Sequence, residues 1–361
     1  MPYPVRQVLN SAAAARLFAG LISLAGLSAQ ALPLTATEVL RHFNVVTLGD
    51  FAMASDSTSH VEGLTFVGGS LTGPSTSWAY GEPNQHKIAS YGGFAGLTVL
   101  GNASKVRVQG GATVLGSFTN SEVQNGNTAA GTATNVNFNG GGLFYALDTG
   151  LGSWNATSAQ ERKTTALATD FGALLHGASD TFKSLADTGS TVANNGFGKL
   201  TFTAVAGSDG VAVFNLAGLS AALTSAGEFD FVLGAGVTSV VLNSDLVTGT
   251  LHANFLGGSA LSMGSKLLWN FYDASNITFT AQFGGSILAP DAAISNPGGG
   301  SNLEGGIFVN SITQGSEIHQ RAYEGGVPTA TPVPEPQSWL LLAAGLLAVS
   351  GQLRLRRRRA P

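Results

Sequence analysis

Two short His/Glu pairs are the residues best suited to acid–base chemistry. His60 and Glu62 are separated by one residue, and so are Glu317 and His319. Side chains at positions i and i+2 of a β-strand project from the same face, so each pair could exchange a proton. A hydrogen-bonded surface pair is the simpler interpretation of both.

Four carboxylates could converge if distant strands stack: Asp50, Asp56, Glu62 and Glu304. Convergence would give a hydrolase site, which needs two carboxylates within about 5 to 10 Å, or a calcium site. The regular Gly-Gly-x-Gly-x-Asp repeat of calcium-binding coils is absent from the sequence. The six histidines, at positions 42, 60, 86, 176, 252 and 319, contain no local metal motif, and no nucleophile elbow, Walker loop or His-Glu-x-x-His occurs. We therefore predict no catalytic residue, no cofactor and no metal site.

The elements that would position these side chains are predicted to be strands. The chain has 49 glycines, little charge and many β-branched residues, which favours short strands joined by tight turns. Residues 97–102 and 112–117 resemble copies of one rung, and residues 303–309 echo 61–67. We predict a mainly β fold, a β-solenoid with glycines at its corners. A β-sandwich is the alternative.

One amphipathic helix is expected on the flank of this β structure. Ser158 to Glu161 forms a capping box sequence, and apolar residues recur at helical spacing until Gly189, namely Phe171, Leu174, Leu175, Ala178, Phe182 and Leu185. Residues 120–142 are predicted to be a loop or a polar rung. Residues 73–93 are predicted to be an insertion loop, whose Trp78, Tyr80 and Tyr91 could stack on sugars or pin the loop to its own domain.

The C-terminal residues have the layout of a membrane sorting segment. Val333, Pro334, Glu335 and Pro336 precede an apolar stretch over 338–353, which as a helix would be roughly 24 Å long against a bilayer core of about 30 Å. A basic cytoplasmic tail over 354–361 follows, with Arg354, Arg356, Arg357, Arg358 and Arg359. This order resembles the PEP-CTERM sorting signal of Gram-negative bacteria that make exopolysaccharide. The resemblance implies processing by a membrane protease of the exosortase type, while an ordinary C-terminal anchor is the alternative.

The N-terminal residues 1–31 are predicted to be a signal peptide. An apolar run over 17–27 is followed by Ala29-Gln30-Ala31, a small-x-small cleavage site. An uncleaved N-terminal anchor is the alternative. Without both targeting segments, ten basic residues face twenty acidic ones, which argues against a nucleic-acid partner. Because the chain has no cysteine, disulfides and thiolate chemistry are excluded.

The exported part, residues 32–326, resembles the choice-of-anchor A family. Its opening features are Phe43 to Asp50, Val61-Glu62-Gly63 and Val67-Gly68-Gly69; its closing features are Leu268 to Phe271, Phe283 to Pro290 and Gly315 to His319. The resemblance implies an adhesive extracellular domain with no established catalytic residue, followed here by a proline-rich linker over 327–337. The stretch 73–93 is longer than the family pattern.

These features predict an exported, membrane-anchored surface protein that is adhesive or structural in an extracellular polysaccharide matrix. The alternative is a polysaccharide-active β-helical hydrolase or lyase. A flat-face ice binder would require ranks of threonine at alternate positions, and Thr250, Thr278 and Thr280 are too few along the chain to indicate one.

Overall fold

The computed structural model describes residues 33–54, 59–74, 79–80, 90–139, 144–146, 153–256 and 258–328. Within these ranges the chain is mainly β with few helices, as predicted. No helix in the described ranges combines the length and apolarity needed to cross a membrane. The predicted signal peptide with Ala29 and Ala31, the sorting motif from Val333 to Pro336, the apolar stretch 338–353 and the arginines of the tail lie outside the described residues.

Parallel strands form a first row along the longest axis of the molecule. In spatial order the row contains β14 (Val211–Asn215), β16 (Ser239–Ser244), β19 (Leu267–Phe271), β22 (Ser286–Asn296), β24 (Ile307–Gln314), β1 (Phe43–Thr47), β3 (Leu64–Val67), β6 (Leu97–Val99), β9 (Ala112–Val123), β10 (Thr128–Phe138) and β11 (Phe144–Ala146). Long strands such as β22, β24, β9 and β10 continue past this row into the next one.

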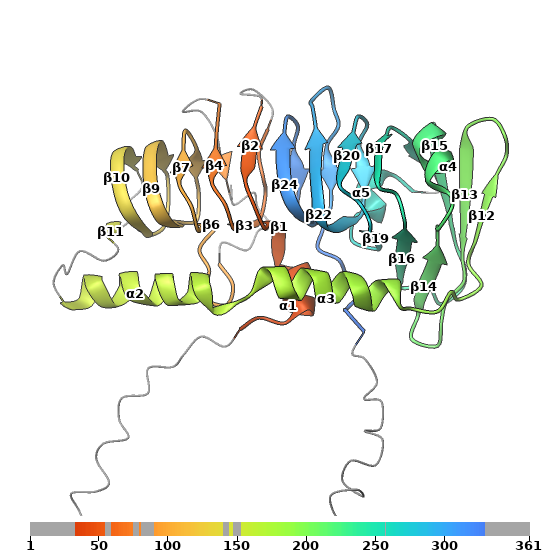
Figure 1. The fold of residues 1–361 in the computed structure, drawn as a ribbon, viewed down its shortest axis with the longest axis horizontal. Coiled ribbons are helices and arrows are strands. Elements are labelled where there is room, and N and C mark those ends of the chain that lie inside the picture. The colour runs from red at the N-terminus through yellow and green to blue at the C-terminus, as the bar shows by residue number, and fades with distance from the viewer. Residues whose placement is uncertain are drawn as a thin grey trace, which may run out of the picture.

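A second row of parallel strands faces the viewer in Figure 1. Its members are β17 (Thr248–Leu251), β20 (Asn276–Phe279), the later parts of β22 and β24, β2 (Phe51–Met53), β4 (Leu71–Thr72), β7 (Ala103–Ser104) and the middle parts of β9 and β10. Each strand therefore has a parallel partner on both sides, except at the two ends of the row.

The remaining strands make shorter ladders. Near one end, β12 (Thr191–Asn194) pairs antiparallel with β13 (Lys199–Ala204), which continues parallel through β15 (Glu228–Leu233) to β18 (Asn254–Leu256). In the middle, β21 (Phe283–Gly284), β23 (Leu303–Glu304) and β25 (Ile318–His319) are parallel, and Val61 adds a bridge to Ile318. Toward the other end, β5 (Ala79–Tyr80) pairs with β8 (Arg107–Val108), which pairs with the last residues of β9.

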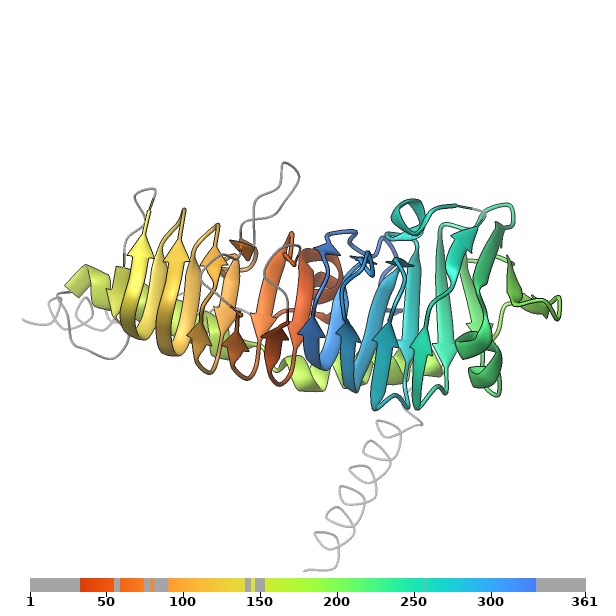
Figure 2. The same ribbon diagram turned by 90° about the horizontal axis from the view of Figure 1, so that it is seen from above.

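The first and last described strands of the chain lie in the middle of these rows (Figure 2). From β1 the chain advances to β11 at one end, and α2 (Ser153–Ala168) and α3 (Phe171–Lys183) then carry it back past the middle to the other end. From there it returns strand by strand until β24 pairs with β1 and β2. We call these pairings, together with the Val61–Ile318 bridge, the seam, because they join the first strands of the chain to the last.

The core lies between the rows and is rich in aromatic rings. Trp269 is fully buried among Phe202, Phe229, Phe271 and Phe283, and its indole Nε1 donates to the carbonyl of Gly284 at 3.0 Å. Burying large rings of this kind, with the one polar atom satisfied, stabilises the fold mainly through the hydrophobic effect.

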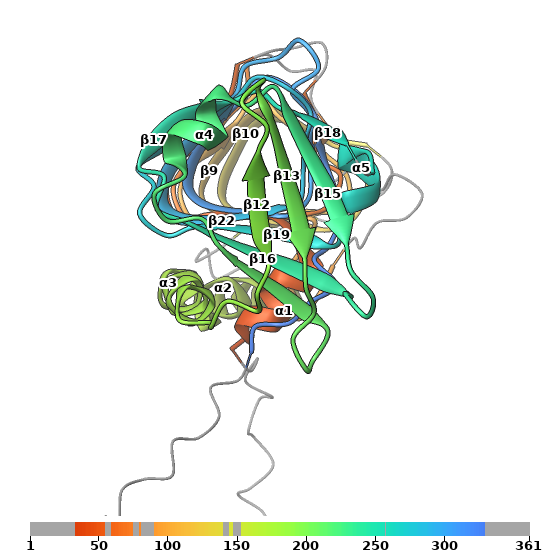
Figure 3. The same ribbon diagram turned by 90° about the vertical axis from the view of Figure 1, so that its right-hand side faces the viewer.

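A second core lies between the first row and the helices α1 and α3, which Figure 3 shows gathered with α2 on one side of the molecule. It contains α1 (Ala36–His42), with buried Val39 and Leu40, and α3. The predicted apolar face of α3 is confirmed: Phe171, Leu175, Ala178 and Phe182 are buried, and Leu174 and Leu185 pack at its edge. Two short helices elsewhere, α4 (Ser220–Ser225) and α5 (Ala260–Met263), complete the described elements.

The expectation of a single helix that starts at the Ser158 capping box is wrong. Ser158 lies inside α2, which begins at Ser153, and the helical segment is broken before Phe171. Asp170 N-caps α3 by accepting a hydrogen bond from the backbone N–H of Ala173 at 2.9 Å. Capping at Asp170 satisfies a free N–H of the new helix and so favours a second start at this point. The helix ends at Lys183, before Gly189.

Near β9 and β10 the chain turns from one ladder of strands into the next at points that are fifteen residues apart, which we call corners. Lys105, Asn120 and Asn135 are the non-glycine residues with positive φ (59°, 49° and 55°) among those described. Asn135 donates to the side chain of Asn120 at 2.7 Å, so the corners stack on one another. The sequence predicts a loop or a polar rung over residues 120–142; residues 120–123 and 128–138 of this stretch are strand residues of β9 and β10, so a loop is wrong for them.

Candidate functional site

The two His/Glu pairs predicted from the sequence meet at the seam. Val61 pairs with Ile318, and the amide of Ile318 donates to the carbonyl of His60 at 2.9 Å. The flanking residues therefore lie side by side, although they are 257 residues apart in the chain. The His60 and His319 rings have centroids 5.8 Å apart.

The ladder through β21, β23, β25 and Val61 explains how these side chains are aimed. The residues at its central positions, Phe283, Leu303, Ile318 and Val61, are buried in the core. Because side chains alternate between the two faces of a strand, their neighbours lie on the other face of the ladder in two parallel lines. One line is Gln282, Asn302, Glu317 and His60; the other is Gly284, Glu304, His319 and Glu62.

His319 is held between two carboxylates. Its Nδ1 lies 2.7 Å from Oε1 of Glu304, and its Nε2 lies 2.9 Å from Oε2 of Glu317. The other oxygen of Glu317 lies 3.5 Å from Nδ1 of His60. Glu304 is almost fully buried, with 1% of its side chain exposed, whereas His319, His60 and Glu317 are 18%, 23% and 32% exposed. The cluster is therefore buried at Glu304 and open to solvent at His60 and Glu317.

Amides and a guanidinium position the carboxylates. Gln282 donates to Oε1 of Glu304 at 2.6 Å, and Asn302 donates to Oε2 of Glu317 at 3.1 Å. The Arg321 guanidinium Nε lies 3.8 Å from Oε2 of Glu304, an oxygen that has no hydrogen-bond donor. The backbone N–H of Gln320 donates to Glu62 at 2.9 Å.

The electrostatics of the cluster favour positive charge on His319. Burial disfavours the imidazolium, but the hydrogen bond to Glu304 and the charges of Glu304, Glu62 and Glu317 outweigh it, so the pKa of His319 is raised above its usual value. A positive charge on His319 reduces the mutual repulsion of Glu62, Glu304 and Glu317.

Only part of the predicted acidic convergence occurs. Glu62 and Glu304 both act on His319, whereas Asp50 lies directly before β2, where it accepts a hydrogen bond from the backbone N–H of Ser70 at 2.8 Å. Asp56 lies outside the described residues. The proposed hydrolase or calcium site over all four acids is therefore not formed by the three that are described.

The sequence contains a pattern that points to the cluster without forming a local motif. The triplets 60–62, 302–304 and 317–319 each place one apolar residue between two polar ones, and 282–284 resembles them. That alternation marks a strand with one buried face, and its recurrence marks strands that could share a ladder.

The second row of strands carries the other candidate site, a long outward rank of small hydroxyl residues. Register places nine residues next to one another across nine strands: Thr250, Thr278, Ser295, Thr313, Ala52, Thr72, Ser104, Thr119 and Thr134. All are exposed or partly exposed. We call these nine residues the hydroxyl rank; only Ala52 lacks a hydroxyl.

A second polar rank runs beside the hydroxyl rank, two residues earlier along the chain in each case. Its members are Thr248, Asn276, Ala293, Ser311, Asp50, Ser70, Asn102, Ser117 and Thr132, also exposed or partly exposed. Neighbouring strands are about 4.8 Å apart, and alternate residues of one strand about 6.7 Å apart. The two ranks thus form a regular, nearly uncharged array in which Asp50 is the one ionisable residue.

The chain matches a family model over residues 36–320, described as the "Putative Ice-binding-like adhesive domain". The match covers most of the chain and all the strands described above. The chain belongs to this family. No curated protein and no solved structure matches it.

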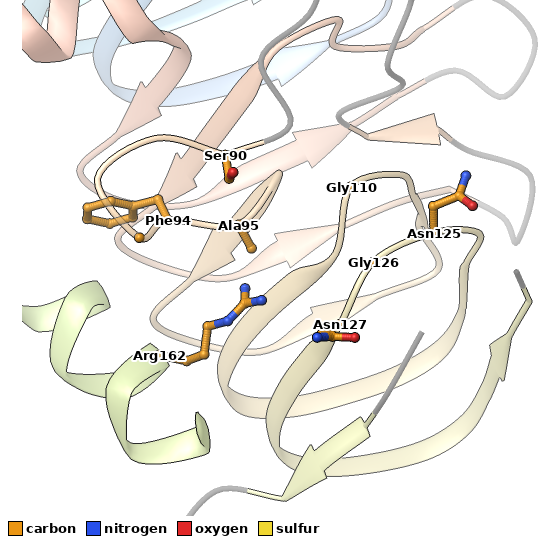
Figure 4. A pocket seen from close by; sticks show the side chains of 9 residues that line it. Ser90, Phe94, Ala95, Gly110, Asn125, Gly126, Asn127 and Arg162 are labelled. Atoms are coloured by element: carbon orange, nitrogen blue, oxygen red, sulfur yellow. The ribbon is translucent and has the colours of Figure 1, made fainter. Parts of the chain in front are cut away.

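A separate cavity of about 580 Å³ opens between α2 and the connecting segments that precede β6, β9 and β10 of this adhesive domain (Figure 4). It is lined by Ser90, Gly93, Phe94, Ala95, Gly110, Asn125, Gly126, Asn127 and Arg162. None of these residues is a carboxylic acid, so the cavity does not provide the pair that glycoside hydrolysis needs.

Among the aromatic residues of the predicted insertion loop, Tyr91 is the one whose side chain is described. Its ring stacks on His42 with centroids 3.6 Å apart, and its hydroxyl donates to Glu38 at 2.9 Å. These contacts pin the segment to α1, so of the two predicted roles the structural one holds for Tyr91. Trp78 lies outside the described residues, and the side chain of Tyr80 is not described.

Proposed function

We propose that the protein is an exported surface adhesin that binds extracellular polysaccharide through the face carrying the hydroxyl rank. The observation that carries the proposal is the match to an adhesive domain family over residues 36–320. The two ranks add a surface suited to the task, because a regular array of hydroxyls can make many weak hydrogen bonds to sugar hydroxyls.

The finer architecture belongs to the same proposal. We interpret the rows of parallel strands as faces of a β-solenoid, in which each coil adds one strand to every row. The fifteen-residue spacing of Lys105, Asn120 and Asn135 and the in-register ladders support this interpretation. A solenoid makes a flat face as long as the stack of coils, so binding strength grows with the number of coils engaged.

The targeting interpretation is also proposed on sequence grounds. The choice-of-anchor A resemblance, the signal peptide over 1–31 and the PEP-CTERM-like tail together imply export across the inner membrane of a Gram-negative bacterium. The helix over 338–353 would hold the protein in the membrane until an exosortase-type protease processes it. An adhesive family suits delivery to the cell surface or matrix.

The binding face can be tested with a charged, bulky substitution set. Thr313→Lys, Thr72→Lys and Thr119→Lys together interrupt the hydroxyl rank and should lower retention on immobilised host exopolysaccharide at least tenfold. The control set is Thr203→Lys, Val232→Lys and Asn254→Lys, which adds the same charge at exposed positions of β13, β15 and β18. Equal retention by both sets would contradict the proposed face.

The hydrolase or lyase alternative finds less support in the geometry. The acids that do meet, Glu62 and Glu304, are 5% and 0% exposed and are engaged by neighbouring groups, so they cannot flank a sugar bond. Depolymerisation of the host's own exopolysaccharide by purified residues 32–332 would nevertheless establish the enzyme and overturn the adhesin.

Ice is a second candidate ligand, favoured by one observation. Along the chain the threonines are few, but across the strands the hydroxyl rank is nearly unbroken. If ice is the ligand, the protein should inhibit ice recrystallisation, and the Thr313, Thr72 and Thr119 lysine set should abolish that effect. Activity that persists in this set would rule out the rank as an ice-binding surface.

The sorting segment has its own experiment. Replacing Pro334, Glu335 and Pro336 by alanine should leave the full-length chain in the membrane fraction, because the extended segment that a protease could grip would be lost. Release that continues unchanged would count against the signal.

A further inference from the structure

The cluster at the seam has the composition and geometry of a transition-metal site. A ring nitrogen of His60, a carboxylate oxygen of Glu317 and a ring nitrogen of His319 lie within 4.8 Å of one another. We propose that His60, Glu317 and His319 bind one first-row divalent metal ion, with Zn²⁺ the best match to two imidazoles and a carboxylate.

The distances suit tetrahedral coordination. Metal–ligand bonds of 2.0 to 2.1 Å place tetrahedral ligand atoms about 3.3 Å apart. Nδ1 of His60 lies 3.5 Å from Oε1 of Glu317, and Nε2 of His319 lies 2.9 Å from Oε2 of the same carboxylate. Small side-chain rotations would bring one of these oxygens and the two ring nitrogens around a common centre. The partial exposure of all three leaves a fourth position for water.

Glu304 completes the site as the partner of a ligand. It lies 2.7 Å from Nδ1 of His319 and is buried, so it can accept the Nδ1 proton and leave Nε2 directed at Glu317. A ring nitrogen lone pair and a carboxylate oxygen at 2.9 Å repel each other unless a proton or a metal ion lies between them. The carboxylate–histidine–metal arrangement supplies that ion and fixes the ring.

The position of the site gives it a role. His60 belongs to the first part of the chain, whereas His319 lies in the last described strand, β25, and Glu317 lies directly before it, so the ion would hold the two sides of the seam together. A ligand that binds only the folded state stabilises it in proportion to its concentration over its Kd.

The test is titration of the full-length, untagged protein with Zn²⁺ by isothermal calorimetry at pH 7.5, after chelation. We expect saturable one-to-one binding and a melting temperature that rises with Zn²⁺ and falls in chelator. His60→Ala and Glu317→Gln should each weaken binding at least a hundredfold, and Glu304→Gln ten- to a hundredfold. His252→Ala and Glu228→Gln, at exposed positions elsewhere, are the matched controls and should bind as the unmodified chain does.

The competing occupant is a proton on His319. Undetectable Zn²⁺ binding by the unmodified chain, or binding that His60→Ala and Glu317→Gln leave intact, would overturn the proposal. Circular dichroism of each variant separates lost binding from lost folding. If His60→Ala does not fold, absorption of bound Co²⁺ in the unmodified protein decides, since tetrahedral ligation gives intense visible bands and hexaaquo Co²⁺ does not. Loss of polysaccharide binding is a separate readout and leaves this result untouched.

Discussion

Buried polar residues specify how α3 docks on the strands. Asn270 is fully buried; its amide donates to the carbonyl of Ser179 and to the side chain of Asn243, and its oxygen accepts from the hydroxyl of Ser179. Asn243 in turn donates to the carbonyl of Phe182 at 2.7 Å. Removing one member leaves its hydrogen-bonding partners unsatisfied, and an unsatisfied buried polar group carries a desolvation penalty.

Asn270→Ala should therefore destabilise the fold by about 3 kcal/mol, since it removes packing and leaves Ser179 and Asn243 without their partners. Asn276→Ala, at an exposed position of β20, should change the free energy of unfolding by less than about 0.5 kcal/mol. Urea denaturation of both variants measures the difference. A loss below about 1 kcal/mol for Asn270→Ala would show that the network is dispensable.

His176 links α3 to β22 through a pH-dependent contact. Its Nε2 lies 3.0 Å from Asp291 and its Nδ1 lies 2.8 Å from the carbonyl of Gly172. The hydrogen bond to Asp291, then that to Gly172, raises the pKa of His176, and the charge of Asp180 acts in the same direction. Only the imidazolium can donate to both acceptors at once.

Because this pKa is raised in the folded state, the stabilisation is complete below pH ~6.5 and is lost as the pH rises through the folded-state pKa. The ring is 46% exposed, so solvent screening limits the effect to roughly 0.5 kcal/mol. His176→Ala should lower the melting temperature relative to the unmodified chain more at pH 5.5 than at pH 9. An equal loss at both values would assign the effect to packing alone.

At the scale of elements, the start of α3 depends on one side chain. Asp170→Ala removes the acceptor for the N–H of Ala173 and should cost about 1 kcal/mol. Asp170→Asn keeps a capping oxygen and should recover most of that loss. Thermal unfolding of the two variants decides, and identical melting temperatures would mean that the cap does not determine the helix start.

The corners are a second element-level determinant. Asn135 has φ of 55°, a conformation that costs an alanine roughly 1 kcal/mol and a glycine nothing. Asn135→Ala should therefore destabilise by about 1 to 2 kcal/mol, with loss of the bond to Asn120 included, and Asn135→Gly by less. Chemical denaturation of both variants tests the order. A glycine variant less stable than the alanine variant would contradict it.

For the whole molecule, the seam makes the two halves of the chain interdependent. Phe308 is fully buried at the seam, where its strand β24 pairs with β1 on one side and β22 on the other. Phe308→Ala should cost about 3 to 5 kcal/mol. In a stack stabilised by nearest-neighbour contacts, that loss weakens the stabilisation that the strands on either side give each other.

Hydrogen exchange should then rise in both halves, at β3 and at β19, rather than in β24 alone. A rise confined to residues near Phe308 would indicate that the halves unfold independently. Val232→Ala, at an exposed position of β15 away from the seam, serves as the control and should leave both regions protected.

The sequence predicted much of the local structure correctly, for reasons that are local. The rungs over 97–102 and 112–117 are neighbours in the first row, and the apolar spacing from Phe171 to Phe182 forms the buried face of α3. The break at Asp170 was missed, because a strong capping box sequence at Ser158 masked a second cap twelve residues later. Helix boundaries depend on which cap the surrounding structure leaves room for.

What the sequence alone determined is the pattern: polar and apolar residues alternating at period two, and an acidic, cysteine-free composition. What only the tertiary structure decided is which strands become neighbours. His60 meets Glu317 and His319, and the scattered threonines form one rank, because parallel strands from distant parts of the chain stack in register. Register is set by burial of alternate side chains across the whole core, so no local stretch of sequence contains it.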